Sequence, residues 1–307
     1  MNAQAPRVLC IGGCHVDRKA TAAAAVQLAV SNPVSISTSF GGVARNVAEN
    51  LCRLETAVTL VSRVGADSDG AAILEALRRL PLGLDHLGIA PDMPTAFHLI
   101  VLQPDGEMLV SVADMRIYDD LTPQRLAALP AGVWGAEAIF ADCNLPAESL
   151  AYLASQRSAE RRLAVNAVSP AKAVRAKGIL PATDLLFVNA AEAAALVGQG
   201  RRDDVPEAAA RTLLERGVGE VVVTLGAQGL LAATPGEVLH LQSLPGPLRD
   251  VTGAGDAVAA AFLDARLRGW SLDAAARRAL GAARLTVACA QSVNTKLTPE
   301  SLDQMMS

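Results

Sequence analysis

A glycine-rich segment that ends in an aspartate carries the clearest chemical signal in the sequence. It reads DVTGAGD at 250–256, and the amphipathic stretch 257–268 follows it as a predicted helix. Gly253 and Gly255 permit backbone angles that turn successive N–H groups toward one point, and the helix dipole adds positive potential there. Phosphate fits such a place. In the first helical turn the dipole would keep Asp256 ionised, able to take a proton from an attacking hydroxyl. The plainer alternative is a glycine turn with a capping aspartate.

A second glycine loop also opens a predicted helix. It reads FGGVARNVA at 40–48. Gly41 and Gly42 let a ligand approach the backbone, and Asn46, one turn further on, offers a donor and an acceptor to a sugar hydroxyl. A turn followed by a helix cap would explain the same residues.

Other phosphate-binding patterns do not occur in the sequence. It contains no G-x-x-x-x-G-K-[ST], no G-x-G-x-x-G after the first predicted strand, and no pair of H-R-D and D-F-G motifs. The sequence therefore lacks the motifs that would identify it as a P-loop enzyme, a dinucleotide-dependent oxidoreductase or a protein kinase.

Short apolar runs alternate with alanine-rich helical segments and must position these loops. The runs are 8–11, 58–64, 138–141, 163–165, 185–188 and 221–225. The alternation predicts an α/β fold, a doubly wound and mostly parallel sheet flanked by helices on both faces. Because ligands bind at the carboxyl ends of such strands, the strand-end residues Gly12, Asn166, Asn189 and Thr224 mark the expected site.

Two regions interrupt this alternation. Segments 33–40 and 95–114 read as strands, and the second is folded back by a Pro-Asp-Gly turn at 104–106. They predict a small antiparallel β-sheet lid, with strands within about 15–20, 33–40 and 94–114, that excludes water from the site. An edge hairpin with no role in closure is the alternative. We expect residues 1–307 to form a single domain, and unpaired lid edges are suited to a homodimer.

Composition restricts the possible partners and location. Of 307 residues, 51% are hydrophobic, but no run approaches the ~18 apolar residues of a membrane helix. The formal net charge of −4 argues against a nucleic-acid partner. We expect a cytoplasmic protein that binds a small molecule and no membrane. Its five scattered cysteines, an odd number, are expected to be reduced thiols in the core: Cys10, Cys14, Cys52, Cys143 and Cys289.

Together the two glycine loops resemble the signatures of the PfkB family of carbohydrate and nucleoside kinases, which have the ribokinase-like fold. The resemblance covers nearly the whole chain. Further expected parts appear in order: Asp17 after the first strand, Asn189-Ala-Ala-Glu192, and Thr224-Leu-Gly226 before Gly229. It implies an ATP-dependent kinase that transfers a phosphoryl group to a hydroxyl.

The resemblance also implies a role for each part. Asp17 would bind substrate hydroxyls, and Asn189 with Glu192 would help place Mg²⁺ and the phosphates, Glu192 acting on the metal indirectly. Thr224, Gly226 and Gly229 would border the nucleotide. The remaining implied residues are Gly253, Ala254 and Gly255 as the anion hole, Asp256 as the base, and Asp250 for a monovalent cation such as K⁺.

Within the family the chain is most similar to the pseudouridine kinases. The matching stretches are GGVARNVAEN at 41–50, GEMLVSVADM at 106–115, ADCN at 141–144 and VNAVSPAK at 165–172. This likeness implies phosphorylation of the 5′-hydroxyl of pseudouridine, with substrate contacts from Thr95, His98, Asp114, Met115, Asn166 and Lys172. The chain departs from related enzymes at Asn166-Ala167, where Asp-Pro is common, and at His15. Another nucleoside, a free sugar such as ribose or fructose, or a non-catalytic binding protein stay open as alternatives.

Overall fold

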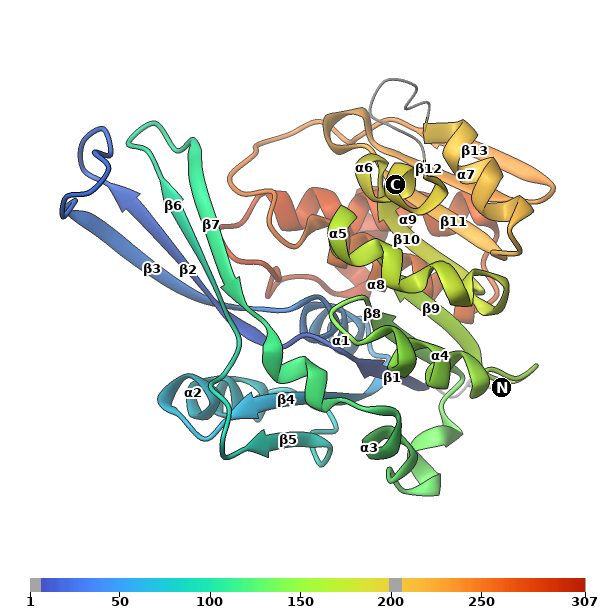
Figure 1. Cartoon of the computed structure of the whole chain (residues 1–307). Coiled ribbons are helices and arrows are strands. Elements are labelled where there is room, and N and C mark those ends of the chain that lie inside the picture. The colour runs from blue at the N-terminus through green and yellow to red at the C-terminus, as the bar shows by residue number, and fades with distance from the viewer. Residues whose placement is uncertain (1–6, 199–205, 307) are drawn as a thin grey trace.

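A large central sheet organises the molecule. The computed structural model describes residues 7–198 and 206–306. In that part of the chain the sheet has nine strands, in the order β13-β12-β11-β10-β9-β8-β1-β4-β5 (Figure 1). The strands are β1 (Arg7–Ile11), β4 (Ala57–Gly65), β5 (Leu87–Ala90), β8 (Ala138–Asp142), β9 (Arg162–Asn166), β10 (Leu185–Asn189), β11 (Glu220–Thr224), β12 (Leu230–Thr234) and β13 (Glu237–Leu241). From β5 to β11 neighbours are parallel, and β12 and β13 are antiparallel.

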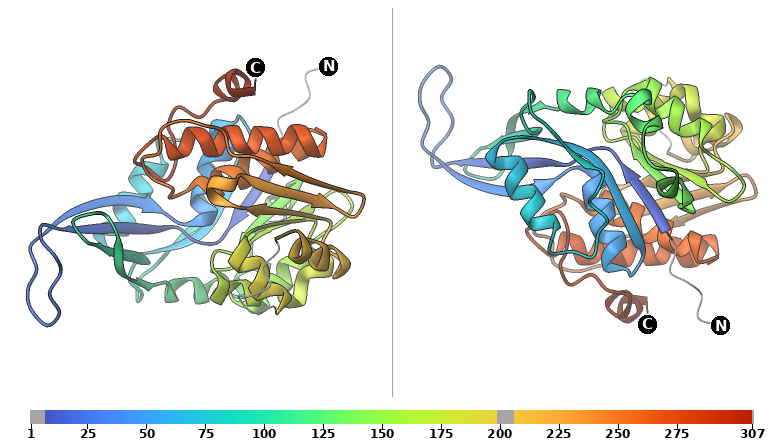
Figure 2. Two further views of the ribbon diagram at one scale, coloured as in Figure 1. Left: turned by 90° about the horizontal axis from the view of Figure 1, so that it is seen from above. Right: turned by 90° about the horizontal axis from the view of Figure 1, so that it is seen from below.

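Helices cover both faces of this sheet, as the alternation of the sequence predicts (Figure 2). One face packs against α1 (Val43–Arg53), α2 (Ser68–Leu77), α8 (Ala254–Leu267) and α9 (Leu272–Val287). The other packs against α3 (Pro123–Ala127), α4 (Ala147–Ser155), α5 (Pro170–Ala173), α6 (Ala190–Val197) and α7 (Pro206–Glu215). The remaining helices of the described residues are the short η1 (Arg116–Asp120), η2 (Ala131–Gly135), η3 (Val174–Ala182) and η4 (Gly226–Gln228) and the terminal α10 (Pro299–Met306).

The order in which the chain forms the strands of the main sheet indicates where a ligand would bind. From β1 the main sheet grows outward through β4 and β5, and the chain then returns to β8 on the other side of β1. In open α/β sheets, such a reversal opens a crevice at the carboxyl ends of the two neighbouring strands. The loops after β1 and β8, and the start of α1, therefore lie beside this crevice.

A four-stranded sheet forms the lid and projects from one side of the molecule (Figures 1 and 2). Its strands β2 (His15–Ala22), β3 (Val34–Gly41), β6 (Phe97–Leu102) and β7 (Met108–Asp114) occur in the order β3-β2-β6-β7. The lid is not wholly antiparallel as predicted, because β2 and β6 pair in parallel. The chain passes through α1, β4, α2 and β5 before β6 returns in the direction of β2.

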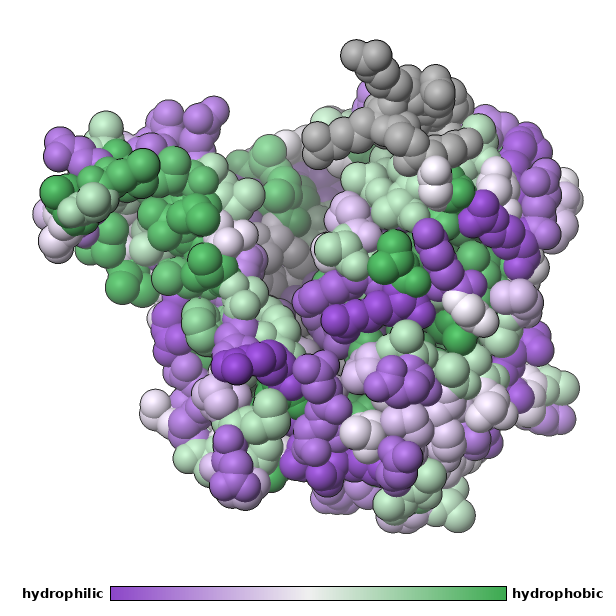
Figure 3. Space-filling view, viewed as in Figure 1, coloured by the Kyte–Doolittle hydropathy of each residue, from purple (hydrophilic) through white to green (hydrophobic). Residues whose placement is uncertain are grey.

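Hydrophobic side chains cover much of the visible surface of the lid (Figure 3). Exposed apolar residues on β3 and β7 include Ile36, Met108, Val110 and Val112. Elsewhere, all five cysteines are free, and four are buried while Cys289 is half-buried, so only the first four belong to the core. No helix among the described residues has the length and apolar character needed to cross a membrane.

Candidate active site

The glycine loop at 253–255 leads directly into α8. Gly253 is the N-cap of this helix and has a left-handed backbone with φ 80°. A side chain at this position would place its Cβ 1.8 Å from the carbonyl oxygen of Ser292. The N–H of Ala254 donates to the Val251 carbonyl at 3.2 Å, so the amides of Gly253 and Gly255 are the more accessible candidates for an anion. The anion hole formed by Gly253, Ala254 and Gly255 stays a prediction.

Asp256 lies in the first turn of α8, facing the second glycine loop. Its Oδ2 accepts a hydrogen bond of 2.8 Å from Nδ2 of Asn46 on α1. The Oδ1 of Asn46 in turn accepts from the Arg45 guanidinium at 2.9 Å. The Asn46 amide is buried and bonded at both ends, so it orients the aspartate, and its contact with a sugar hydroxyl stays a prediction.

The sequence predicts that the helix dipole keeps Asp256 ionised, and the surroundings of the carboxylate in the fold oppose this effect. Burial raises its pKa to about 7, and the negative charges of Asp142 and Asp17 act in the same direction. The hydrogen bond from Asn46 and the charge of Arg45 oppose this rise without cancelling it. A carboxylate with a pKa near the working pH is well matched to general-base catalysis, because it is both available and basic enough to take a proton.

Asp17, predicted to bind substrate hydroxyls, lies on lid strand β2 between two histidines. Its Oδ1 is 3.3 Å from Nε2 of His15 and 3.3 Å from Nδ1 of His98. Burial raises the pKa of Asp17, but hydrogen bonds and charge from both histidines outweigh it and hold the pKa well below its usual range. Gly41 is required beside it, because a Cβ there would lie 2.0 Å from Oδ2 of Asp17. The structure thus brings Asp17, His98 and Gly41 together.

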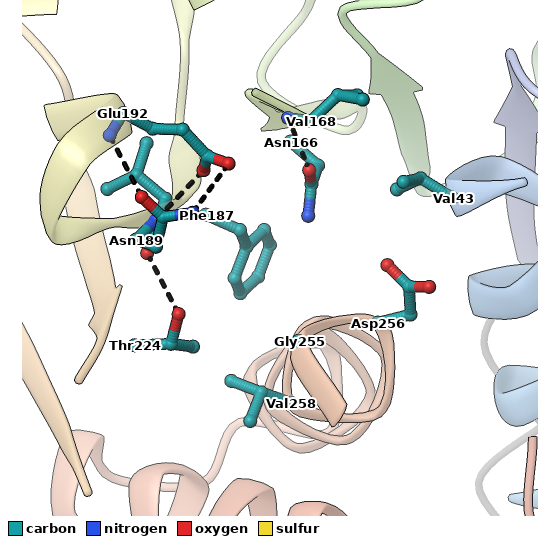
Figure 4. Close-up of a pocket in the computed structure, with 11 residues that line it drawn as sticks. Val43, Asn166, Val168, Phe187, Asn189, Glu192, Thr224, Gly255, Asp256 and Val258 are labelled. Atoms are coloured by element: carbon teal, nitrogen blue, oxygen red, sulfur yellow. Dashed lines mark hydrogen bonds between the residues drawn. The ribbon is translucent and has the colours of Figure 1, made fainter. Parts of the chain in front are cut away.

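A cavity of about 150 Å³ separates Asp256 from the start of α6 (Figure 4). Asn189 and Glu192 form a capping box at the start of α6, on one wall of the cavity: the Asn189 N–H donates to Glu192 Oε2 at 2.9 Å, and the Glu192 N–H donates to Asn189 Oδ1 at 2.9 Å. Burial raises the pKa of Glu192. Asn166 also lines this cavity. Three predicted residues from separate strand ends, Asn166, Asn189 and Thr224, therefore meet here.

A larger cavity of about 630 Å³ lies on the other side of the α8 start. Thr224, Gly226 and Gly229, which are predicted to border the nucleotide, all line it. Its remaining lining is mostly apolar and includes Ala227, Leu230, Leu244, Leu248, Val251, Leu280 and Val287. The two cavities share Asn189, Thr224, Gly255 and Val258, so a ligand in the larger one can extend toward Asp256.

Several predicted residues are engaged elsewhere. Thr95 is 3% exposed, and its hydroxyl donates to Asp67 and accepts from the Gly65 N–H, so that hydroxyl is not free for substrate. The assignment of Thr95 as a substrate contact stays a prediction. Asp114 is ion-paired with Arg116 at 2.6 Å.

Two more predicted contacts have defined neighbours. Lys172 donates to Asn144 Oδ1 at 2.5 Å, and burial lowers its pKa. Met115 is half-buried and packs against the core cluster on the α4 side of the sheet. Both stay predictions as substrate contacts. Gly42 is the N-cap of α1 at the crevice, with φ 102°.

Asp142 is a site residue that the sequence reasoning missed. It is fully buried at the carboxyl end of β8, and its carboxylate accepts from the N–H groups of Gly13 at 2.8 Å, Ala44 at 2.9 Å and Asn144 at 2.9 Å. It therefore fixes three loops at the crevice and supplies negative charge near Asp256. The signal was present, because Asp142 directly follows the apolar run 138–141.

Arg284 of α9 was also missed. Its guanidinium donates to the carbonyls of Pro245 and Pro247, both at 2.9 Å, and holds the loop that lines the larger cavity. Nothing in the local sequence distinguishes it from other helical arginines. Val168, in the lining of the smaller cavity, has a left-handed backbone with φ 66°, which is unusual for a β-branched residue.

The residues present are compatible with Mg²⁺ held mainly by a nucleotide. In the described part of the chain, no group of three or more His, Cys, Asp or Glu side chains could hold a metal by itself. Mg²⁺ keeps several waters and is commonly bound by one or two carboxylates plus substrate phosphates. Glu192, beside the shared wall of the two cavities, fits the predicted indirect role.

Comparisons with known proteins agree with this arrangement. Residues 5–299 match the model of the pfkB family carbohydrate kinases. The pseudouridine kinase of Escherichia coli (strain K12) is 31% identical over 294 residues, which cover 95% of this chain and 93% of that protein.

Solved structures support the same placement. A carbohydrate kinase from Agrobacterium tumefaciens has a TM-score of 0.84 and 34% identity, covering 98% of this chain and 97% of that one. A ribokinase from Arabidopsis thaliana, solved with ribose and ATP, has a TM-score of 0.85 at 22% identity and covers 99% of each chain. Because the family model spans nearly all of the sequence, this chain belongs to the PfkB family and is a phosphotransferase with an alcohol acceptor and a ribokinase-like fold.

Proposed function

We propose that the protein transfers the terminal phosphoryl group of ATP to the 5′-hydroxyl of pseudouridine, giving pseudouridine 5′-phosphate and ADP. The observation that carries this proposal is Asp256, a carboxylate with a pKa of about 7 that lines the smaller cavity, next to Gly255 in the wall shared by the two cavities. It would accept the proton of the attacking hydroxyl. The Gly253 and Gly255 amides, at the positive end of α8, would stabilise charge on the transferred group.

The nucleotide is assigned to the larger cavity. At about 630 Å³ it is large enough for a purine nucleoside, and its apolar lining suits a base. A ligand seated there would direct its phosphates along Thr224 and Asn189 toward Gly255. Mg²⁺, when bound, would neutralise phosphate charge, and Glu192 would orient its water ligands.

The acceptor is assigned to the lid side of Asp256. An ionised Asp17 can accept hydrogen bonds from two neighbouring hydroxyls, the arrangement that a ribose presents. Pseudouridine is favoured over other ribosides by the 31% identity with the E. coli pseudouridine kinase. The second candidate is another nucleoside or a free sugar, since ribokinases share the fold and a free sugar offers the same hydroxyls.

A coupled assay of ADP release tests the proposal. Pseudouridine, uridine, adenosine, ribose and fructose are compared at equal concentration, and we expect the highest kcat/KM with pseudouridine. Uridine is the sharpest control, because it has the same ribose and nearly the same base shape. Turnover with a free sugar alone would reject the nucleoside assignment, and no turnover with any acceptor would favour a binding protein.

Three further properties are proposed with this function. The chain would act as a single kinase domain over residues 1–307, in the cytoplasm, with Asp17 supplied by its lid. A homodimer through the lid would cover apolar side chains such as Ile36, which is 62% exposed on edge strand β3, and Met108, which is 63% exposed on β7. Light scattering after size exclusion tests it, and a monomer mass at high protein concentration would reject the dimer.

A further inference from the structure

A lysine of the lid reaches the loop that leads into the anion hole. Nζ of Lys19, on β2, is ion-paired with Oδ2 of Asp250, a residue 231 positions away in the sequence. The same Nζ donates to Oγ1 of Thr252 at 3.2 Å. Both partners are mostly buried, with side-chain exposures of 24% for Lys19 and 21% for Asp250. The carboxylate expected to hold a monovalent cation is therefore already paired with a cation of the chain.

The Asp250 carboxylate also shapes the turn before Gly253. Its other oxygen, Oδ1, accepts from the N–H of Thr252 at 2.9 Å and from the Thr252 hydroxyl at 2.6 Å. Thr252 immediately precedes the N-cap of α8. A cation beside this carboxylate thus stabilises the turn that sets the direction of the anion-hole amides.

Strand geometry places Lys19 on the side of the lid that faces the active site. Alternate residues of a strand point to the same face, so Lys19 lies on the same face of β2 as Asp17. Arg18 points to the opposite face, where its guanidinium pairs with Asp69 of α2 at 2.7 Å. Strand β2 thus carries Asp17, which is expected to bind the acceptor substrate, and two residues further on Lys19, whose positive charge contacts the loop at Asp250.

We propose that the Lys19 ammonium takes the place of a bound monovalent cation, so that K⁺ is not needed for activity. A bound ion must be captured from solution, whereas a lysine on the lid is held near its carboxylate by the fold. The ammonium is available to Asp250 only when β2 lies against the loop, which couples placement of the lid to the shape of the anion hole. This inference depends on the proposed phosphoryl transfer only where kcat is measured.

The test compares wild-type protein with Lys19→Met in K⁺ and in tetramethylammonium salts of equal ionic strength. Met retains much of the aliphatic stem and removes the charge. For the wild type we expect kcat to agree within about twofold in the two salts. For Lys19→Met we expect kcat to fall by about tenfold or more in tetramethylammonium and to recover in part with K⁺. The acceptor is whichever compound the substrate panel identifies.

A second readout does not need turnover. The melting temperature of each protein is measured with ADP in the two salts, and K⁺ should raise it for Lys19→Met but not for the wild type. If the substrate proposal failed, this measurement would still decide the present one. Arg18→Met is the matched control, since it removes one positive charge from the neighbouring residue on the opposite face and should leave the cation response unchanged.

Three results would overturn the inference. The first is a wild-type enzyme that K⁺ activates several-fold, and the second is a Lys19→Met variant with wild-type kcat in tetramethylammonium. If Lys19→Met does not fold, Asp250→Asn replaces it. That variant removes the partner of Lys19 and the ligand of any ion, so its kcat should fall and K⁺ should not restore it. Full activity of Asp250→Asn is the third contradicting result.

Discussion

The substitution Asp256→Asn removes the negative charge of the proposed base and keeps the shape of its side chain. The amide has nearly the same size, and its oxygen can still accept the hydrogen bond from Asn46. Folding and ATP binding should therefore be retained. Since a positioned general base contributes about 10²–10⁴-fold, kcat should fall by a factor in that range.

The raised pKa of Asp256 adds a second, quantitative expectation. Its pKa is raised from 3.8 to about 7, and burial is the largest cause. At about 1.36 kcal/mol for each tenfold change in the ionisation constant, the ionised form costs about 4 kcal/mol in the folded protein, as an upper value. Because the folded pKa is the higher one, this cost is absent below pH 4, grows between about pH 4 and 7, and is complete above pH 7.

Asp256→Asn should therefore be more stable than the wild type at pH 8, by up to about 4 kcal/mol, and the gain should shrink toward zero near pH 4. Loss of the favourable carboxylate–dipole interaction, about 0.5 kcal/mol, reduces the gain slightly. The wild-type kcat/KM should rise about tenfold per pH unit below pH 7 and level off above it. Urea denaturation at pH 5 and pH 8 and a pH profile of ADP release measure these quantities.

The matched control is Asp273→Asn, which changes another acidic residue in the first turn of a helix, α9, where Asp273 pairs with Arg277. It should leave kcat and the pH profile unchanged. The reasoning would be refuted by near wild-type kcat in Asp256→Asn, by a wild-type profile without an inflection near pH 7, or by a stability difference that does not grow between pH 5 and pH 8.

Two glycine substitutions test the geometry on either side of the base. Gly41→Ala, whose Cβ would lie 2.0 Å from Asp17 Oδ2, should raise KM for the acceptor and leave KM for ATP nearly unchanged; equal effects on both constants would contradict this. Gly253→Ala places a side chain at φ 80° and 1.8 Å from the Ser292 carbonyl, so kcat should fall and stability drop by about 1–3 kcal/mol in urea denaturation. Wild-type kcat and stability would show that the loop tolerates a different path. Gly236→Ala, where a Cβ would meet nothing within 4 Å, is the control for both and should be neutral.

Local patterns in the sequence predicted six of the nine strands of the main sheet, and they did not predict β5, β12 or β13. The six apolar runs lie in strands β1, β4 and β8 to β11, except for the last residue of the run 221–225, because fully buried parallel strands require continuous hydrophobic residues. The lid strands followed from alternation and from the turn at 104–106. The glycine loop before α8 was also readable, since a left-handed residue at a helix start favours glycine. The parallel pairing of β2 with β6 was not, because it depends on the path of the intervening chain.

The chemical state of the site depended on contacts between distant segments. Asn46 meets Asp256 across 210 positions and Lys19 meets Asp250 across 231, and no local pattern specifies either pair. The two histidines reach Asp17 from different strands, and Asp142 raises the pKa of Asp256 from the end of β8. The sequence by itself determined which residue types lie at strand ends and helix starts, since these follow from local backbone preferences. Only the tertiary structure decided their partners and protonation, because burial and Coulomb interactions depend on distances in space.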